Sequence, residues 1–477
     1  MNRITNNSVN INISNNRRCV SDEHGTVYEL DRKLGEGGQG KVYSVKNGRY
    51  AIKVLQQANQ SQREGLRRQI RSVQRLTQLD LKGLNIARPI ALLKEPRLGY
   101  VMELLTGMEP LSNLIPTPLQ FREIDNLVEW YLQGGGLGRR LKLLAKCAEI
   151  FSKLHAKGLV YGDPSPNNIF VSSSNNSEEV WLIDSDNLRF EDSAIASRLR
   201  TTPYAAPEIE LGISGTNTLT DAHAFAVIAF KTLSFVHPLM GDLVENGDPE
   251  MINQAVKGNL PWVDHPNDDC NRPSFGFPRD MVLSPRLQRL CAKIFGEGLT
   301  NPQVRPSVNQ WVETLHSAAD YMLQCQSCES TFYATSKLCP WCDAPRSSFV
   351  QLAISQWEPQ YGAVLPILQA IALQVNQPRE LTRRITRGWV ENQQDQACIR
   401  LTAQQEATGF HIIVQSLDGK SYWLTSDGRE KLEVEFGDRP KRFPIDPQRF
   451  GAWFLHFGAL DRPHRVAKFN LVMGGVS

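Results

Sequence analysis

A glycine-rich segment constrains the fold of the first hundred residues more than any other feature. Residues 34–42 read Leu-Gly-Glu-Gly-Gly-Gln-Gly-Lys-Val and contain the pattern Gly-x-Gly-x-x-Gly-x-Val. Glycine lets a backbone approach a phosphate group without a Cβ clash. Strand-like sequence lies on both sides, which predicts a hairpin over phosphates rather than the helix-opening loop of a dinucleotide fold. A plain glycine turn fits the same letters. The residues that would line the phosphates are Gly35, Gly37, Gly40 and Val42.

Four polar side chains follow in an order that suits phosphate and metal chemistry. Lys53 lies in the strand-like stretch 50–55, from which an ammonium group could reach phosphates. Asp163 and Asn168 stand five residues apart in one loop, a spacing that an ordinary Asp-Pro/Asn turn does not explain. Asp184 ends the strand-like Trp181-Leu182-Ile183, where a carboxylate can bridge Mg²⁺ and phosphate. For Asp186 we favour a turn cap over a second metal ligand.

This order of motifs resembles protein kinases. Ala206-Pro207-Glu208 matches the end of a kinase activation segment, and Asp221 matches the aspartate that ties down the catalytic loop. Over roughly residues 28–320 the chain resembles a bacterial protein kinase of the eukaryotic Ser/Thr type. The resemblance implies Mg-ATP-dependent transfer of the γ-phosphoryl group to a protein hydroxyl, with Asp163 as catalytic base. It makes Lys53, Asn168 and Asp184 catalytic as well, with Asn168 and Asp184 as Mg²⁺ ligands. The residues implied around adenine are Ala51, Met102, Glu103 and Leu105.

The resemblance also implies an α+β fold with two lobes. The expected domains are a polar segment at 1–25, a small lobe at about 26–105 and a large lobe at about 106–320, then a zinc ribbon at 321–347 and a β-rich accessory domain at 350–477. Helical periodicity predicts helices at 60–79, 141–155, 220–235, 286–295 and 307–323. Strands are expected at 27–34, 42–46, 50–55 and 99–105.

Several positions depart from the kinase pattern. The catalytic-loop arginine and lysine are replaced by Gly162 and Ser165, and the phenylalanine after Asp184 is Ser185. Without that arginine, a phosphorylated activation loop loses its usual partner, so activation should not need phosphorylation of Ser193, Ser197, Thr201 and Thr202. The partner of Lys53 is open between Glu64 and Gln69. Two other functions remain in view: a pseudokinase scaffold and a small-molecule kinase.

Two Cys-x-x-Cys pairs follow the kinase-like region. Their spacing is Cys-x₂-Cys-x₁₀-Cys-x₂-Cys, which predicts a tetrahedral Cys₄ zinc site with Thr331-Phe332-Tyr333 as a ribbon strand. Four protein ligands leave no open position, so the zinc should be structural. Local disulfides or unpaired thiols are the alternatives. The ligands would be Cys325, Cys328, Cys339 and Cys342.

The tail carries no chemistry that the sequence reveals. Residues 350–376 fit either a helix or a linker, and strands are expected from Ala397 onward. Asp418-Gly419, between the strand-like stretches 410–415 and 421–424, predicts a β-hairpin. The appended cysteine pairs resemble a narrower group of kinases, those associated with a von Willebrand A-type protein and a metal-dependent phosphatase in tellurite-resistance-like systems. That resemblance implies these two partners in addition to a protein substrate.

Composition argues against other partners. The net charge is only +3 and no basic block stands out, so no nucleic acid is expected. The most apolar long stretch, 222–240, contains Lys231 and two histidines, which predicts a buried helix rather than a membrane span. The asparagine-rich start, 1–16, lacks the apolar core of a signal peptide. We therefore expect a soluble, cytoplasmic protein.

Overall fold

The computed structural model describes residues 19–37, 40–55, 60–78, 81, 83–124, 126–191, 201–388, 393–407 and 409–475. These residues form two compact units. The first unit takes its residues from Met1–Leu111 and Lys153–Ala224, and the second from Ser112–Ser152 and Phe225–Ser477. The first unit therefore holds the glycine-rich segment and the loop of Asp163, and the second holds the cysteine pairs and the tail.

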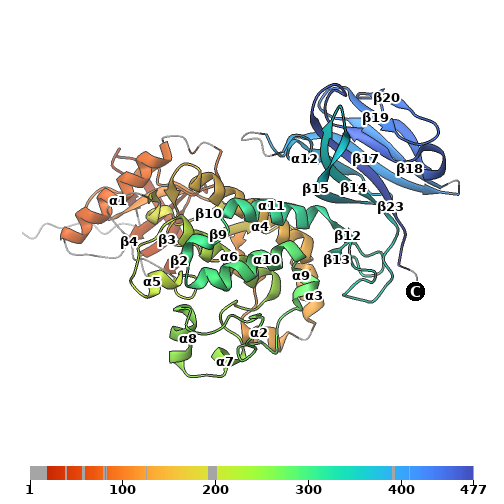
Figure 1. Cartoon of the computed structure of the whole chain (residues 1–477). Coiled ribbons are helices and arrows are strands. Elements are labelled where there is room, and N and C mark those ends of the chain that lie inside the picture. The colour runs from red at the N-terminus through yellow and green to blue at the C-terminus, as the bar shows by residue number, and fades with distance from the viewer. Residues whose placement is uncertain are drawn as a thin grey trace, which may run out of the picture. The chain divides into compact units, whose positions relative to one another are not determined.

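A six-stranded antiparallel sheet dominates the first unit (Figure 1). Its strands, in spatial order, are β1 (Cys19–Ser21), β2 (Val27–Gly37), β3 (Gly40–Val45), β4 (Tyr50–Leu55), β6 (Gly99–Glu103) and β5 (Ala91–Leu92). One face buries a cluster that includes Val45, Ile52 and Val101. The strands expected in this region are confirmed, with ends that differ by a few residues.

One helix, α1 (Gln60–Gln78), interrupts the sheet between β4 and β5, as its periodicity predicts. Ile70 and Val73 on this helix are buried. Ile70 shares a cluster with Leu55, Leu98 and Tyr100 of the sheet region. The helix is therefore stabilised mainly by packing its apolar face against the sheet region, and less by its intrinsic helix propensity.

Short strands hold the loops that carry Asp163 and Asp184. β7 (Met108–Pro110), β9 (Ile169–Ser172) and β10 (Val180–Leu182) form one small sheet, and β8 (Leu159–Val160) pairs with β11 (Arg189–Phe190). The loop of Asp163 runs from β8 to β9, and Asp184 follows β10 directly. The 3-10 turn η2 (Ser185–Asn187) and the short helix α5 (Pro207–Glu210) come after it.

Helices fill the N-terminal part of the second unit. They are η1 (Leu111–Leu114), α2 (Pro118–Glu123), α3 (Leu127–Gln133), α4 (Gly136–His155), α6 (Thr218–Ser234), α7 (Asp242–Glu245), α8 (Pro249–Val256), α9 (Arg279–Val282), α10 (Pro285–Phe295), η3 (Glu297–Leu299), η4 (Pro302–Val304) and α11 (Val308–Asp320), of which η1, α4 and α6 begin or end in the first unit. Phe225–Phe230 of α6 are completely buried, which confirms the buried helix expected there. No helix among the described ranges combines the length and apolarity that crossing a bilayer requires.

The C-terminal part of the second unit is a β-sandwich that follows the small β12–β13 ladder (Met322–Gln324 and Thr331–Tyr333). One sheet has six strands, in the order β15 (Gly362–Gln374), β14 (Phe349–Glu358), β23 (His464–Val472), β22 (Trp453–His456), β19 (Tyr422–Ser426) and β20 (Glu433–Phe436). The other has four, in the order β16 (Arg379–Thr382), β17 (Ala397–Glu406), β18 (Gly409–Ser416) and β21 (Lys441–Ile445). The short helices α12 (Arg383–Arg387) and α13 (Pro447–Phe450) connect strands.

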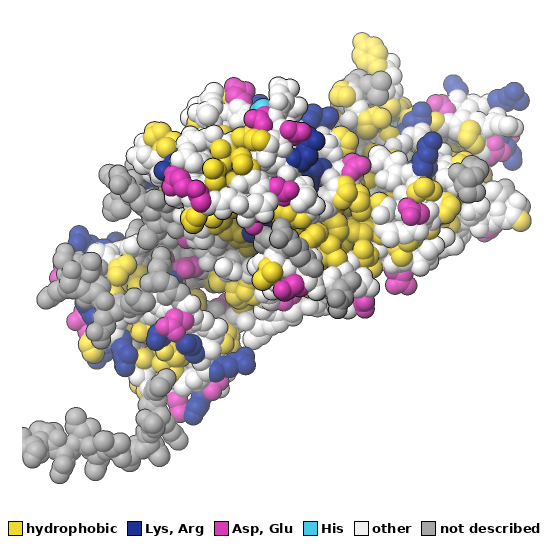
Figure 2. Space-filling view, turned by 90° about the horizontal axis from the view of Figure 1, so that it is seen from below, with side chains coloured by type: hydrophobic (Ala, Val, Ile, Leu, Met, Phe, Trp, Pro, Cys, Tyr) yellow, Lys and Arg dark blue, Asp and Glu magenta, His cyan; other side chains and the backbone are white. Residues whose placement is uncertain are grey.

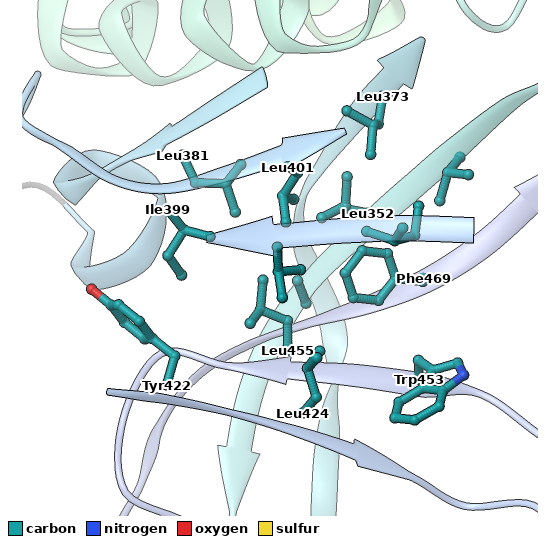
Figure 3. Close-up of a cluster of buried hydrophobic side chains, with 14 of the residues drawn as sticks. Leu352, Leu373, Leu381, Ile399, Leu401, Tyr422, Leu424, Trp453, Leu455 and Phe469 are labelled. Atoms are coloured by element: carbon teal, nitrogen blue, oxygen red, sulfur yellow. The ribbon is translucent and has the colours of Figure 1, made fainter. Parts of the chain in front are cut away.

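The two sheets share one core. Figure 3 shows Leu352, Leu424 and Phe469 of the six-stranded sheet facing Leu381 and Leu401 of the four-stranded sheet. Strand β18 alternates strictly between buried and half-buried residues, as a strand with one face in a sandwich core must. The expected β-rich tail is confirmed as an architecture.

The structure corrects three expectations. Residues 350–376 are not a helix or a linker: they form most of β14 and β15, because Val350, Leu352 and Ile354 alternate into the sandwich core. The helix expected over 307–323 ends at Asp320, since Met322–Gln324 pair with β13 instead. Both errors arise because short apolar runs fit a helix and a buried strand equally well.

The third correction concerns Asp418-Gly419, which does not close a β-hairpin. β18 pairs with β17 and β21, whereas β19 pairs with β20 and β22. The turn itself exists, with Gly419 at φ +72°, and the Asp418 carboxylate accepts hydrogen bonds from Lys420 N–H and Tyr422 OH. It carries the chain from one sheet to the other, because the residues on both sides bury their apolar faces in the common core.

Candidate functional site

Lys53 lies at the centre of the first unit's sheet, on β4 between Val42 of β3 and Tyr100 of β6. Its side chain is 7% exposed. The ammonium group donates to Asp184 Oδ1, and to Asp186 Oδ2 at 2.6 Å. Burial lowers the pKa of Lys53, but the charges of Asp186 and Asp184 outweigh it and raise the pKa overall. The lysine therefore stays charged inside the protein.

Asp184 is the more accessible of the two carboxylates. It follows β10 with a left-handed backbone (φ 58°, ψ 53°), and 31% of its side chain is exposed. Burial raises its pKa, Lys53 opposes this, and Asp186 adds to it, which brings the pKa to about 6. The carboxylate is therefore mostly ionised at neutral pH and reachable by a cation.

The expectation that Asp186 caps the next turn is wrong. Its Oδ2 accepts from Lys53 and its Oδ1 has no hydrogen-bond partner among the described residues, with 7% of the side chain exposed. Gln69 on α1 donates from Nε2 to the backbone carbonyl of Asp186 at 2.7 Å. Glu64, the other residue considered as partner of Lys53, is exposed on α1. The carboxylates that the structure brings to Lys53 thus come from the segment after β10.

Asp163 lies in a loop that is anchored by a buried carboxylate. Asp221 on α6 accepts hydrogen bonds from the N–H groups of Tyr161, at 2.7 Å, and Gly162, at 3.0 Å. Thr201 donates to Asp163 from its N–H (2.8 Å) and its hydroxyl (3.1 Å). Burial raises the pKa of Asp163, and the two bonds from Thr201 oppose that rise. Asp221 therefore makes the hydrogen bonds to the catalytic loop that the resemblance to kinases implied.

Asn168 connects the two acidic positions. Its Nδ2 donates to the backbone carbonyl of Asp163 at 3.1 Å, which leaves the side-chain carbonyl oxygen for a cation. Its backbone carbonyl accepts from the N–H of Ile183, the residue before Asp184, at 2.9 Å. The structure therefore brings Lys53, Asp163, Asn168 and Asp184 into one hydrogen-bonded neighbourhood within the first unit.

The candidate nucleotide-lining residues lie on adjacent strands of the same sheet. Gly35 pairs with Val42, and Gly37 with Gly40, across the β2–β3 turn, whose residues Gly38 and Gln39 are outside the described ranges. A Cβ at Gly40 would lie 2.3 Å from the carbonyl oxygen of Val54, so Gly40 is also required for close strand packing. The remaining residues are Ala51 opposite Met102, Glu103 opposite Tyr50, and Leu105 just after β6.

Two contacts at this site were missed by the sequence analysis. Thr201 was considered only as a phosphorylation site, although its position five residues before Ala206-Pro207-Glu208 could have suggested a role beside Asp163. The Lys53–Asp186 pair was missed as well, because its two residues lie 133 positions apart and no local pattern links them.

The second unit contains a separate candidate metal site. The four cysteine Sγ atoms lie within 4.8 Å of one another, with 3.6 Å between Cys325 and Cys342 and 3.7 Å between Cys328 and Cys339. Zn–S bonds of about 2.3 Å in a tetrahedron place sulfur atoms about 3.8 Å apart. The donor set and its spacing therefore fit a zinc ion.

The cysteine-bearing segment packs on the helices of its own unit. Thr331 Oγ1 accepts from the N–H of Gly138 on α4 at 2.8 Å. The ring of Trp341 stacks on Tyr131 with 4.9 Å between centroids, and Tyr333 OH donates to the carbonyl of Val282 at 3.0 Å. These contacts seat the segment on α3, α4 and α9.

Charges of both signs lie on the face drawn in Figure 2, where Lys, Arg, Asp and Glu side chains are scattered among hydrophobic areas. This agrees with a net charge of only +3.

Comparison with known proteins identifies the family. The protein kinase domain model matches residues 28–316, which is more than half of the chain. The chain therefore belongs to the protein kinase domain family, and the resemblance to kinases is confirmed at that level.

The similar curated proteins include bacterial Ser/Thr kinases. Serine/threonine-protein kinase pkn2 of Myxococcus xanthus is 29% identical over 234 residues, which cover 46% of this chain and 26% of that protein. PknA of Mycobacterium tuberculosis is 26% identical over 229 residues, 45% of this chain and 48% of that protein. Myosin light chain kinase A of Dictyostelium discoideum is 25% identical over 242 residues, 49% of this chain and 74% of that protein. The chain thus spans about a quarter to three quarters of the length of these relatives.

Proposed function

We propose that this protein is a Mg-ATP-dependent Ser/Thr protein kinase. The observation that carries the proposal is the Lys53–Asp184 ion pair, set beside the Asp163–Asn168 loop in one unit. A strand lysine, an acidic residue after a second strand and an Asp-x-x-x-x-Asn loop are the parts that kinases use on ATP. Membership of the kinase family and the names of the bacterial relatives support the same chemistry.

Each side chain has a role that its surroundings support. The Lys53 ammonium would bind the α- and β-phosphates, for which its raised pKa keeps it charged. Asp163 would accept the proton of the acceptor hydroxyl, with Thr201 fixing the direction of its carboxylate. Asp184 and the side-chain oxygen of Asn168 would hold Mg²⁺, which would neutralise charge on the phosphates. The residues proposed to surround the nucleotide are Gly35, Gly37, Gly40, Val42, Ala51, Met102, Glu103 and Leu105.

The test is transfer of radiolabelled phosphate from ATP by the purified full chain. We expect Asp163→Ala and Asp184→Ala to abolish transfer to Ser and Thr in protein acceptors. Asp269→Asn, a change at an exposed aspartate, is the matched control and should leave transfer unchanged. Equal activity in wild type and Asp163→Ala would contradict the proposal. Nucleotide binding without transfer would favour a pseudokinase scaffold, and transfer only to a metabolite would favour a small-molecule kinase.

We also propose that residues 321–347 form a structural zinc ribbon on the cysteine cluster, between a kinase domain at 26–320 and an accessory domain at 350–477. The four thiolates would complete the coordination of the ion and fix the β12–β13 ladder, whose few backbone bonds cannot hold it alone. Metal analysis should give one zinc per chain.

The narrower resemblance supports a proposal about partners. A von Willebrand A-type protein and a metal-dependent phosphatase would act together with this kinase. Transfer of radiolabelled phosphate to a purified von Willebrand A-type protein, and its removal by the phosphatase, is the test.

A further inference from the structure

We propose that Asp186 is the positioning residue that neutralises Lys53. Other kinases use for this purpose a glutamate on the helix that follows the lysine-bearing strand, which is α1 here. This inference rests on the proposed kinase function. A kinase lysine must keep its counter-ion to stay aimed at the phosphates. Here that counter-ion would come from the segment after β10 instead of from α1.

The geometry around Lys53 supports this role. The ammonium is buried, and a buried cation needs paired carboxylates to remain charged. Asp186 Oδ2 lies 2.6 Å from Nζ, and its side chain is as buried as that of the lysine, each 7% exposed. Asp184 also touches Nζ but is 31% exposed. When Asp184 turns to a cation, Asp186 is the carboxylate that remains with Lys53.

Helix α1 offers no carboxylate that could pair with Lys53 in this way. In the sequence of α1, Glu64 is the sole carboxylic residue, and it is exposed. Glu64 precedes Gln69 by five residues, which turns it by about 140° around a helix of 3.6 residues per turn. A sliding movement of the helix would therefore not bring Glu64 to the face that carries Gln69.

Gln69 has a different task, which is to hold Asp186. Its amide donates to the backbone carbonyl of Asp186 at 2.7 Å. The helix thus positions the counter-ion of Lys53 without supplying it. Displacing α1 would move Asp186 and Asp184 together, because they belong to the same short segment.

The surroundings of Asp186 do not favour a metal-ligand role. Oδ2 is engaged by Lys53 and Oδ1 is buried, so neither oxygen faces solvent from which a cation could arrive. Tyr100 covers this side of the site: its ring centroid lies 5.9 Å from Lys53 Nζ. Burial, and then the charges of Asp186 and Asp184, raise the pKa of the Tyr100 phenol well above its usual value, so it adds no charge.

The experiment uses the full chain and measures two properties: the Kd of a fluorescent ATP analogue with saturating Mg²⁺, and the KM and kcat of phosphate transfer. Asp186→Asn should weaken nucleotide binding and raise KM by about tenfold to a hundredfold, the loss expected for one charged hydrogen bond. Adding Gln69→Glu to Asp186→Asn returns a carboxylate from α1 and should recover most of that loss. A purely structural role for Asp186 would not be rescued by moving the charge.

Several results would overturn the proposal. Unchanged Kd and KM in Asp186→Asn would do so, as would a loss that Gln69→Glu fails to recover. So would a raised Mg²⁺ requirement at unchanged KM for ATP, since that is the behaviour of a metal ligand. The Kd measurements test Asp186 even if no phosphate transfer is found, so that failure of the proposed function stays distinguishable.

A second pair of variants covers a folding defect in Asp186→Asn. Lys53→Met combined with Asp186→Asn removes charge and counter-charge together and should be more stable than Asp186→Asn alone. A double variant that melts no higher than the single variant would count against the pair.

Discussion

Thr201 donates hydrogen bonds to both carboxylate oxygens of Asp163, from its N–H to Oδ1 and from its hydroxyl to Oδ2. A residue just before the Ala206-Pro207-Glu208 motif thereby sets the direction of the proposed catalytic base. Its hydroxyl is already engaged in the site, which separates Thr201 from Thr202, whose hydroxyl donates to Glu210.

Thr201→Val should lower kcat for phosphate transfer by about tenfold, because the bond from hydroxyl to carboxylate is lost and Asp163 gains freedom. Thr201→Ser should keep most of the activity. Thr202→Val is the control, since the Thr202 hydroxyl donates to Glu210 and not to Asp163. Equal kcat in Thr201→Val and wild type would show that Asp163 needs no such support.

Activity should not depend on phosphorylation of the activation segment. Gly162 replaces the usual arginine and has φ +90°, with Asn187 Cβ 3.3 Å from where its own Cβ would be, so a large side chain does not fit there. We expect the triple variant Ser193→Ala, Ser197→Ala, Thr202→Ala to transfer phosphate within about twofold of wild type. Ser193 and Ser197 lie outside the described residues, and Thr201 is left intact for the reason above. Loss of activity in this folded variant, restored by acidic replacements, would contradict the expectation.

The pH profile should report Asp184. Burial raises its pKa to about 6 against the pull of Lys53, so kcat/KM for ATP should fall as pH drops below about 6, by about tenfold per pH unit.

The free energy of unfolding should change in the opposite direction and rise as pH falls. Because the folded-state pKa lies above the unfolded value, the folded form binds more protons between pH 3.8 and 6, and this group adds stability as pH falls through that window. Rates and melting temperatures measured from pH 7.5 to 5 check both signs; a flat kcat/KM would refute the assignment.

Cys342→Ser should remove most of the bound zinc and lower Tm by more than about 5 °C, because the loss of one thiolate breaks a closed Cys₄ site. Cys270→Ser is the matched control: both cysteines are exposed, and Cys270 lies outside the cluster. Zinc content and calorimetry on the two variants provide the measurement. Wild-type protein that contains no zinc, or a Cys342→Ser variant that keeps it, would count against the ribbon.

Asp320 should be among the costliest acidic residues to replace. It is buried at the end of α11 and pairs with Arg379 at 2.5 Å and Arg384 at 2.8 Å, which lowers its pKa despite burial. Asp320→Ala leaves the buried Arg384 without this partner, and the free energy of unfolding should fall by about 3–5 kcal/mol. Glu380→Ala breaks the exposed pair with Arg400 and should cost no more than about 1 kcal/mol. Urea titrations followed by tryptophan fluorescence compare them, and similar midpoints would contradict the difference.

The central strands of the six-stranded sheet and the site loops could be predicted because local signals and tertiary structure agree there. The glycines at 35 and 40 mark the turn between two strands, and Asp163 and Asn168 are placed by one short loop. The strand containing Lys53 is predicted to the residue, because β-branched and apolar residues fill Tyr50–Leu55.

The features that could not be predicted depend on contacts between residues that are far apart in the sequence. Local spacing could not distinguish a cap from a counter-ion at Asp186, because its partner Lys53 is 133 residues away. Asp418-Gly419 gave the correct turn and the wrong strand pairing, since the sandwich core and not the turn selects partners. The apolar run at 350–376 lacked a period that excludes a helix.

The cluster around Asp320 bears on where this chain can be cut. A boundary drawn at residue 320 separates the last helix of the kinase-like region from Arg379 and Arg384, which are supplied by the β-sandwich. It also removes Thr331 from Gly138 and Trp341 from Tyr131. A fragment ending there would expose an uncompensated carboxylate and bare aromatic surface. Within the second unit, the helices of the kinase-like region and the β-sandwich therefore belong together for expression, crystallisation and domain exchange, although their sequences look modular.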